Sequence, residues 1–167
     1  MRVLGTDPGT ASTGYGVVDC DGDHLVALCY GVITTPADWS LPQRLQEIYL
    51  RLRTLAAEWR PDSAAVEDLF FSKNARTALT VGHGRGVALL ALADAGLPIH
   101  EYKPAEVKEA VTGYGAAPKG QVQVMVQQLL GLQAPPHPDD AADALAIAIC
   151  HIHSARWRSF GAQCPNG

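Results

Sequence analysis

The sequence predicts an α/β domain with a mixed β-sheet, and three observations support this fold class. The first 35 residues contain three short apolar runs separated by turn signals, and Asp21-Gly22 between two of them is typical of a β-hairpin. Further along, apolar residues recur at steps of three and four, as on the buried face of an α-helix. Two more apolar runs lie between these helical segments. Strands that alternate with helices favour a layered α/β architecture.

Five apolar runs bounded by turn residues predict the strands. The first ends at Pro8-Gly9, which is a turn signal. The second and third are the two sides of the hairpin, so two or three antiparallel strands open the fold. The predicted strands cover residues 2–7, 14–20, 24–34, 63–67 and 97–102.

The helices are predicted from apolar periodicity and from residues that start or stop a helix. Ser40 and Gln43 form a capping-box pattern at the start of the first helix, and Pro61 ends it. The second helix contains glycines at positions 82, 84 and 86, and each costs roughly 1 kcal/mol relative to alanine. We therefore expect another backbone, or a ligand, to approach this helix closely. The predicted helices cover residues 41–59, 73–95, 104–112, 119–132 and 139–158.

Length and composition place the chain among globular proteins of one domain. It has 167 residues, of which 47% are hydrophobic and 18% charged. We expect one folded domain over residues 1–158 and a flexible C-terminal tail over residues 159–167. Asp7 interrupts the apolar N-terminus that a signal peptide needs, and no apolar run is long enough to span a membrane. We therefore expect a cytoplasmic protein with no membrane contact, whose four cysteines fit no zinc spacing and stay reduced.

Carboxylates stand where α/β folds commonly build sites. Asp7 and Glu67 end predicted strands, while Asp139, Asp140 and Asp143 open the last helix. Asp140 and Asp143 are three residues apart, so they share one helix face. Clusters of oxygen ligands suit hard cations such as Mg²⁺ or Mn²⁺. Several convergent carboxylates can hold two such ions about 4 Å apart, an arrangement suited to phosphoryl transfer.

Each carboxylate by itself also has an ordinary structural explanation. Asp7 fits a turn residue, and Asp139 and Asp140 fit the capping of a helix N-terminus. Asp143 and Glu67 are harder to explain in this way, because both follow apolar residues and an unpaired buried charge is costly. Sequence spacing does not establish that these side chains meet.

The charge distribution gives mixed indications about nucleic-acid binding. The net charge is −4, and DNA-binding proteins are usually basic. Residues 73–119, however, include six basic and four acidic side chains, and all four lysines of the chain lie there. A locally basic face is compatible with these numbers.

Several motifs occur in a distinctive order and spacing from residue 1 to about residue 154. The motifs are Gly5-Thr6-Asp7-Pro8-Gly9, Gly14-Tyr15-Gly16, Val66 to Asn74, Gly82 to Gly86, and Asp140-Ala141-Ala142-Asp143-Ala144-Leu145-Ala146. A single Asp-Pro-Gly would be a weak signal, whereas the ordered set is specific. Together the motifs resemble those of the RuvC family of Holliday junction resolvases.

The resemblance implies an RNase H-like fold, with a five-stranded mixed sheet flanked by helices. It also implies a homodimer that resolves four-way DNA junctions in homologous recombination and DNA repair. Such an enzyme nicks two opposed strands symmetrically and leaves 5′-phosphate and 3′-hydroxyl ends. The branch-migration proteins RuvA and RuvB are the implied partners, and the helix with three glycines is a candidate for part of the dimer interface.

The family's metal-binding acids correspond to Asp7, Glu67, Asp140 and Asp143, which implies two Mg²⁺ ions per subunit, with Mn²⁺ able to substitute. Asp7 would bridge the ions, and Glu67 and Asp143 would each hold one. Asp140 would bind a metal or orient the water nucleophile, and some family members carry histidine at its position. The neighbouring Asp139 receives no catalytic role.

The resemblance also implies contacts with DNA. Lys108 and Lys119 correspond to residues that contact the DNA backbone, although isolated lysines are ordinarily solvated surface charges. Lys73 and Arg76 are further candidates for phosphate contacts. Phe70 corresponds to an aromatic residue at the junction crossover, where it can stack on a base.

Three other functions are compatible with parts of the sequence. An actin-like kinase shares a related phosphate loop, but it needs two such domains and would bind ATP. A non-catalytic module of the same fold would lack some of the acids, which this chain keeps. A nuclease for RNA–DNA hybrids or plain duplex would differ from a resolvase only in its substrate.

Overall fold

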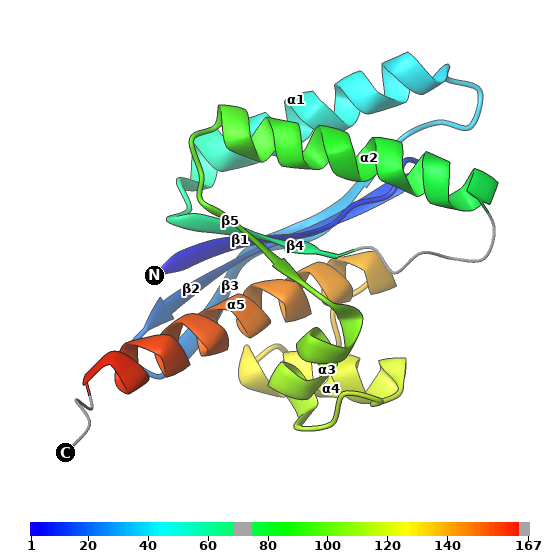
Figure 1. Ribbon diagram of the computed structural model, residues 1–167. Helices are drawn as coiled ribbons and strands as arrows, with labels where there is room; N and C mark the ends of the chain where they lie inside the picture. Colours follow the sequence, from blue (N-terminus) through cyan, green and yellow to red (C-terminus); the bar gives the residue numbers. More distant parts are fainter. Residues whose placement is uncertain (69–74, 164–167) are drawn as a thin grey trace.

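The computed structural model describes residues 1–68 and 75–163, which form a β-sheet covered by helices on both faces (Figure 1). The strands follow the order β3-β2-β1-β4-β5 across the sheet. β2 runs antiparallel to both β1 and β3, whereas β1, β4 and β5 are parallel. This confirms the predicted five-stranded mixed sheet flanked by helices. The strands are β1 (Arg2–Asp7), β2 (Ser12–Asp21), β3 (His24–Thr34), β4 (Ser63–Glu67) and β5 (Ile99–Tyr102).

The predicted hairpin joins β2 and β3, but its turn lies one residue later than expected. Asp21 pairs with His24, so the two loop residues are Gly22 and Asp23. Gly22 has a φ of 57°, a left-handed conformation that a glycine at the first turn position adopts without strain.

Two helical layers cover the sheet (Figure 1). α1 and α2 pack on one face, where Leu4 and Val17 of the sheet are buried, and α3, α4 and α5 pack on the other face, where Val3 and Val18 are buried. The alternation of Val3 and Leu4 along β1 therefore divides the core between the two layers. The helices are α1 (Leu41–Trp59), α2 (Ala75–Asp94), α3 (Pro104–Thr112), α4 (Lys119–Leu129) and α5 (Asp139–Gln163).

Some element boundaries differ from the predictions. α4 ends at Leu129 instead of residue 132, because Gly131 turns the chain with a φ of 62°. α5 continues past Arg158 to Gln163, so the first residues of the expected tail are helical, while residues 164–167 lie outside the described part. The last strand begins at Ile99, two residues later than expected.

Glycines allow α5 to pack directly on the sheet. A Cβ atom on Gly5 would lie 2.1 Å from the backbone oxygen of Ala144, and one on Gly14 would lie 2.0 Å from that of Asp140. The first turns of α5 are thereby fixed against β1 and β2. Of the three glycines expected to permit close approach in α2, Gly84 does so, with a Cβ position 3.0 Å from Gly9, whereas Gly82 and Gly86 have nothing within 4 Å.

Candidate active site

Asp7 and Glu67 project from the same edge and the same face of the sheet. β1 and β4 are parallel neighbours, so their carboxyl ends lie side by side. Side chains alternate between faces along a strand. Val3 and Ala65 belong to the core under α5, and Asp7 and Glu67 follow them by even numbers of residues, so both acids point toward α5.

The first two turns of α5 bring two more acids to this edge. One carboxylate oxygen from each of Asp7, Asp140 and Asp143 forms a group whose members lie within 4.8 Å of one another. Glu67 lies outside this tight group, but its charge interacts with those of Asp7 and Asp143. The structure therefore brings together the four acids that the sequence singled out, three closely and one beside them.

Burial and mutual repulsion make this cluster bind protons more tightly than ordinary carboxylates. Burial, followed by the charges of Asp143 and Asp140, raises the pKa of Asp7 from 3.8 to about 6. Burial and the charge of Asp7 raise the pKa of Glu67 from 4.5 to about 7. A cation that neutralises the negative charge of such a site stabilises it.

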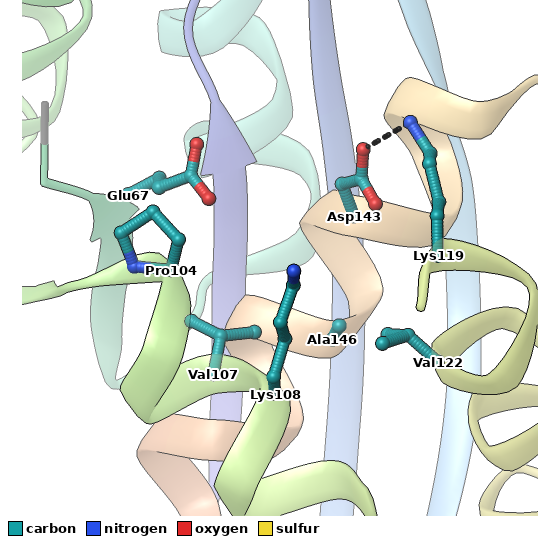
Figure 2. A pocket seen from close by; sticks show the side chains of 8 residues that line it. All are labelled: Glu67, Pro104, Val107, Lys108, Lys119, Val122, Asp143 and Ala146. Atoms are coloured by element: carbon teal, nitrogen blue, oxygen red, sulfur yellow. Dashed lines mark hydrogen bonds and ion pairs between the residues drawn. The ribbon is translucent and has the colours of Figure 1, made fainter. Parts of the chain in front are cut away.

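A pocket of about 180 Å³ opens beside the acids (Figure 2). Figure 2 shows Glu67 and Asp143 at this pocket, with Lys108 rising from α3 and Lys119 from α4. α3, α4 and α5 form its walls. Its lining consists of Glu67, Pro104, Val107, Lys108, Lys119, Val122, Asp143 and Ala146.

Lys119 forms ion pairs with the N-terminal end of α5. Its Nζ lies 2.9 Å from Oδ2 of Asp143 and 3.4 Å from Oδ2 of Asp139. Burial lowers the pKa of Lys119, but the hydrogen bonds and charges of Asp143 and Asp139 together outweigh burial, so this pKa lies above its ordinary value. Lys108 is half-buried at the same pocket, so both lysines expected to contact DNA border the acidic cluster.

Asp139 stands apart from the cluster. It is exposed, it accepts a hydrogen bond from Nε2 of Gln123 at 2.8 Å, and this bond together with Lys119 lowers its pKa. It is absent from the close group of carboxylates, and that it has no catalytic role stays a prediction.

Arg85 of α2 is a contact of the site region that the sequence analysis did not assign. Its side chain, only 15% exposed, donates to the carbonyl oxygen of Glu67 at 3.3 Å and pairs with Asp68 and Glu101. It thus joins α2 to the ends of β4 and β5. No local pattern singled out this residue, because arginine is common in helices and α2 also contains Arg76.

Other candidates lie elsewhere or outside the described residues. Phe70, Lys73 and the side chain of Arg76 fall outside the part of the chain that the structure describes. His151 is buried and hydrogen-bonded to Ser63 at 3.0 Å and to Tyr102 at 2.7 Å, so it is a core residue. The described cysteines are free thiols, as expected, and none of the described helices has the length and hydropathy needed to cross a membrane.

Comparison with known proteins identifies relatives over nearly the whole chain. The family model described as crossover junction endodeoxyribonuclease RuvC matches residues 3–151. Proteins with that name include one from Syntrophomonas wolfei, which is 55% identical over 96% of this chain and 93% of its own length. Another, from Chloroflexus aurantiacus, is 59% identical over 93% of this chain and 94% of its own length.

Solved structures agree with these sequence relatives. Thermus thermophilus RuvC superposes with a TM-score of 0.88 and 37% identity over 95% of this chain and 97% of that one. The same protein in complex with a Holliday junction substrate gives a TM-score of 0.87 and 35% identity, with 94% and 96% coverage. The yeast mitochondrial resolvase Ydc2 is similar in fold, with a TM-score of 0.66 at 17% identity. These neighbours confirm the predicted RNase H-like fold.

Proposed function

Because this chain belongs to the RuvC family of crossover junction endodeoxyribonucleases, it is a Holliday junction resolvase, and we propose that Asp7, Glu67, Asp140 and Asp143 are its catalytic, metal-binding residues. The enzyme cuts two opposed strands of a four-way junction and leaves 5′-phosphate and 3′-hydroxyl ends. The observation that carries the proposed site is the convergence of three acids within 4.8 Å, beside Glu67, at one edge of the sheet.

The donor chemistry of the site fits a divalent metal ion. All four side chains offer carboxylate oxygens, which Mg²⁺ prefers as protein ligands. Burial and mutual repulsion raise the pKa of Asp7 to about 6 and that of Glu67 to about 7, so positive charge stabilises the ionised cluster. We propose two Mg²⁺ ions per subunit, with Mn²⁺ able to replace them. When bound, such ions activate water and neutralise charge on the phosphate and the leaving oxygen.

The position of each acid suggests which metal ion it would bind. Asp7 interacts with the charges of Asp143 and Asp140 and with Glu67, which supports the proposal that it would be a ligand of both ions. Glu67 and Asp143 would each hold one ion, from β4 and from α5. Asp140 would hold an ion or orient the water nucleophile.

Lys108 and Lys119 would bind the phosphates that flank the scissile bond. They rise from α3 and α4 beside Glu67 and Asp143, within reach of a backbone laid across the pocket (Figure 2). Each phosphate contact contributes about one unit to the salt dependence of binding. Phe70, Lys73 and Arg76 stay proposed junction contacts on the resemblance alone.

We propose that the active form is a homodimer and that α2 contributes to its interface. Leu79 and Leu90 are 64% and 54% exposed. They share one helix face with Gly82 and Gly86, beside which a Cβ atom would meet open space. An exposed apolar face flanked by glycines allows another helix to approach closely. Two linked sites also suit the cutting of two strands.

The family further supports RuvA and RuvB as partners and the cytoplasm as the place of action. We propose that residues 1–158 form the resolvase domain and that residues 159–167 are not needed for cleavage. α5 extends into the first part of that tail. Removal of residues 164–167 should therefore leave junction cleavage unchanged.

Strand cleavage of a synthetic four-way junction tests the function and its site together. The junction would be compared with linear duplex and an RNA–DNA hybrid of matched sequence, each with EDTA, Mg²⁺ or Mn²⁺. Asp7→Asn and Glu67→Gln remove single charges from the cluster, and Asp139→Asn is the matched control on a neighbouring acid outside it. We expect paired symmetric nicks in the junction alone, which require metal, are lost in the first two variants and persist in the third.

Other outcomes would contradict specific parts of the proposal. Tight junction binding without cleavage under any metal would indicate a structural module. Preferential cleavage of the hybrid or duplex would retain the site but replace the substrate. Full activity in Asp7→Asn would refute the assignment of the site.

A further inference from the structure

Ser12 contacts an acid of the proposed active site from the far end of the chain. Its hydroxyl donates to Oδ2 of Asp140 at 2.5 Å, although the two residues are 128 positions apart in sequence. Ser12 is the first residue of β2 and Asp140 lies in the first turn of α5. Both side chains are half-buried, which limits competition from water for this hydrogen bond.

The backbone that carries Ser12 is fixed on both sides. Thr13 donates its hydroxyl to the carbonyl oxygen of Gly9 at 2.6 Å, and Thr35 donates to that of Thr10 at 2.6 Å. Ser12 itself pairs with Thr34 in the sheet. The loop between β1 and β2 is therefore tied to β3, and the hydroxyl of Ser12 has a defined position relative to α5.

Asp140 and Asp143 have partners of different charge. Asp143 pairs with the ammonium group of Lys119 at 2.9 Å, whereas Asp140 accepts from the neutral hydroxyl of Ser12. A cation entering the cluster is repelled by the ammonium group but not by the hydroxyl. The bond from Ser12 can therefore persist when metal binds, and the carboxylate of Asp140 keeps its remaining lone pairs for the ion.

We propose that Ser12 is a positioning residue that holds the carboxylate of Asp140 in the orientation required to bind the metal ion. The inference rests on the proposed function, because it assigns a role in the same site. Hydrogen bonds to metal-binding side chains typically contribute 10–100-fold to metal affinity. The competing explanation is that the bond only fastens β2 to α5, in which case its loss would lower stability and leave metal affinity unchanged.

Thr and Val are nearly isosteric and differ in the hydroxyl group, so they form a matched pair at this position. Direct binding of Mn²⁺ to the dialysed full-length protein without DNA, followed by the electron paramagnetic resonance of free Mn²⁺, gives the affinity. We expect Ser12→Val and Ser12→Ala to weaken binding 10–100-fold and Ser12→Thr to stay near the native value. The Mg²⁺ concentration that gives half-maximal cleavage should rise by the same factor. Thr54→Ala, which removes a hydroxyl bonded to Leu50 on the remote helix α1, is the control for hydroxyl deletion and should change nothing.

A double-mutant cycle between Ser12 and Asp140 distinguishes an effect on metal affinity through Asp140 from a general effect of the Ser12 substitution. In an Asp140→Asn background, Ser12→Val should weaken Mn²⁺ binding by less than twofold, because the carboxylate that it positions is gone. Thermal unfolding would be recorded for every variant, to relate affinity to folded protein.

The failures of the two proposals are distinguishable. Native Mn²⁺ affinity in both the folded Val and Ala variants overturns this inference alone. Equal losses with and without the Asp140 carboxylate, or a loss in the Thr variant as large as in the Val variant, also overturn it. If the unsubstituted protein binds no Mn²⁺ and cleaves no junction, the proposed site fails, and the role of Ser12 fails with it.

Discussion

Replacing Asp7 with asparagine should abolish cleavage and yet stabilise the metal-free protein at alkaline pH. The native fold holds Asp7 against Asp140 and Asp143 in a partly buried cluster, which raises its pKa from 3.8 to about 6. Between these two values the native state binds more protons than the unfolded state, so stability falls as pH rises through this window. Asparagine has no charge to bury, so the stability of the variant should not fall in this way as the pH rises.

The magnitude follows from the pKa. One pKa unit corresponds to about 1.4 kcal/mol, so ionisation of Asp7 lowers the unfolding free energy by up to about 3 kcal/mol at pH 8. For a chain of this size, 1 kcal/mol shifts the melting temperature by about 2–4 °C. Asp7→Asn should therefore melt up to about 6–12 °C above the native protein at pH 8 in EDTA, with little difference at pH 4.

Thermal and urea unfolding at pH 4, 6 and 8, with EDTA and at one protein concentration, would measure this dependence. Asp38→Asn, which changes an exposed acid in the loop after β3, is the matched control and should shift stability by less than about 0.5 kcal/mol at each pH. A variant at Asp7 that is no more stable than the native protein at pH 8, or that keeps the native pH dependence, would refute the electrostatic description of the cluster.

Three further predictions concern the metal, the DNA and the packing of α5. Mg²⁺ at one hundred times its dissociation constant should stabilise the native protein by about 2.7 kcal/mol, and the same addition should leave the stability of the Asp7→Asn variant nearly unchanged. Equal stabilisation of both proteins in thermal unfolding would contradict the assignment of Asp7 as a metal ligand. Lys119→Met should weaken junction binding and reduce the magnitude of the slope of log affinity against log salt by about one, as measured by fluorescence anisotropy. Arg51→Met on the exposed side of α1 is the control and should keep the native slope. Identical slopes in the two variants would exclude a phosphate contact by Lys119. Gly14→Ala should lower the free energy of unfolding by about 3 kcal/mol or more, because its Cβ would lie 2.0 Å from the backbone oxygen of Asp140. Gly120→Ala, with open space around its Cβ, is the control and should be neutral or slightly stabilising. Native stability in the Gly14 variant would show that α5 does not pack as described.

Local patterns in the sequence were sufficient for the elements of the fold. The apolar run of β1 before Pro8-Gly9, the apolar periodicity of α1 and the glycine of the β2–β3 turn depend on residues a few positions apart, and each was predicted from such neighbours. The errors were local as well. The turn lies at Gly22 and Asp23, α4 stops before Gly131, and α5 continues beyond Arg158.

The candidate site was predicted in its residues but not in its contacts. Asp143 attracted attention because a charge in an apolar helix needs a partner, and Lys119 is its partner. The roles of Arg85 at Glu67 and of Ser12 at Asp140 had no local signal, because serine and arginine are common at strand starts and in helices. The glycines of α2 suggested a close approach that occurs within the chain only at Gly84.

The sequence by itself determined which residues end strands, which begin helices and which carry charge, because these properties arise from neighbours along the chain. The family motifs added the expectation that certain acids act together. Only the tertiary structure decided which of them meet: β1 and β4 had to be parallel neighbours, and α5 had to press against Gly5 and Gly14 for its first turn to reach Asp7. Distances between residues more than a hundred positions apart depend on how layers pack, and no local pattern encodes them.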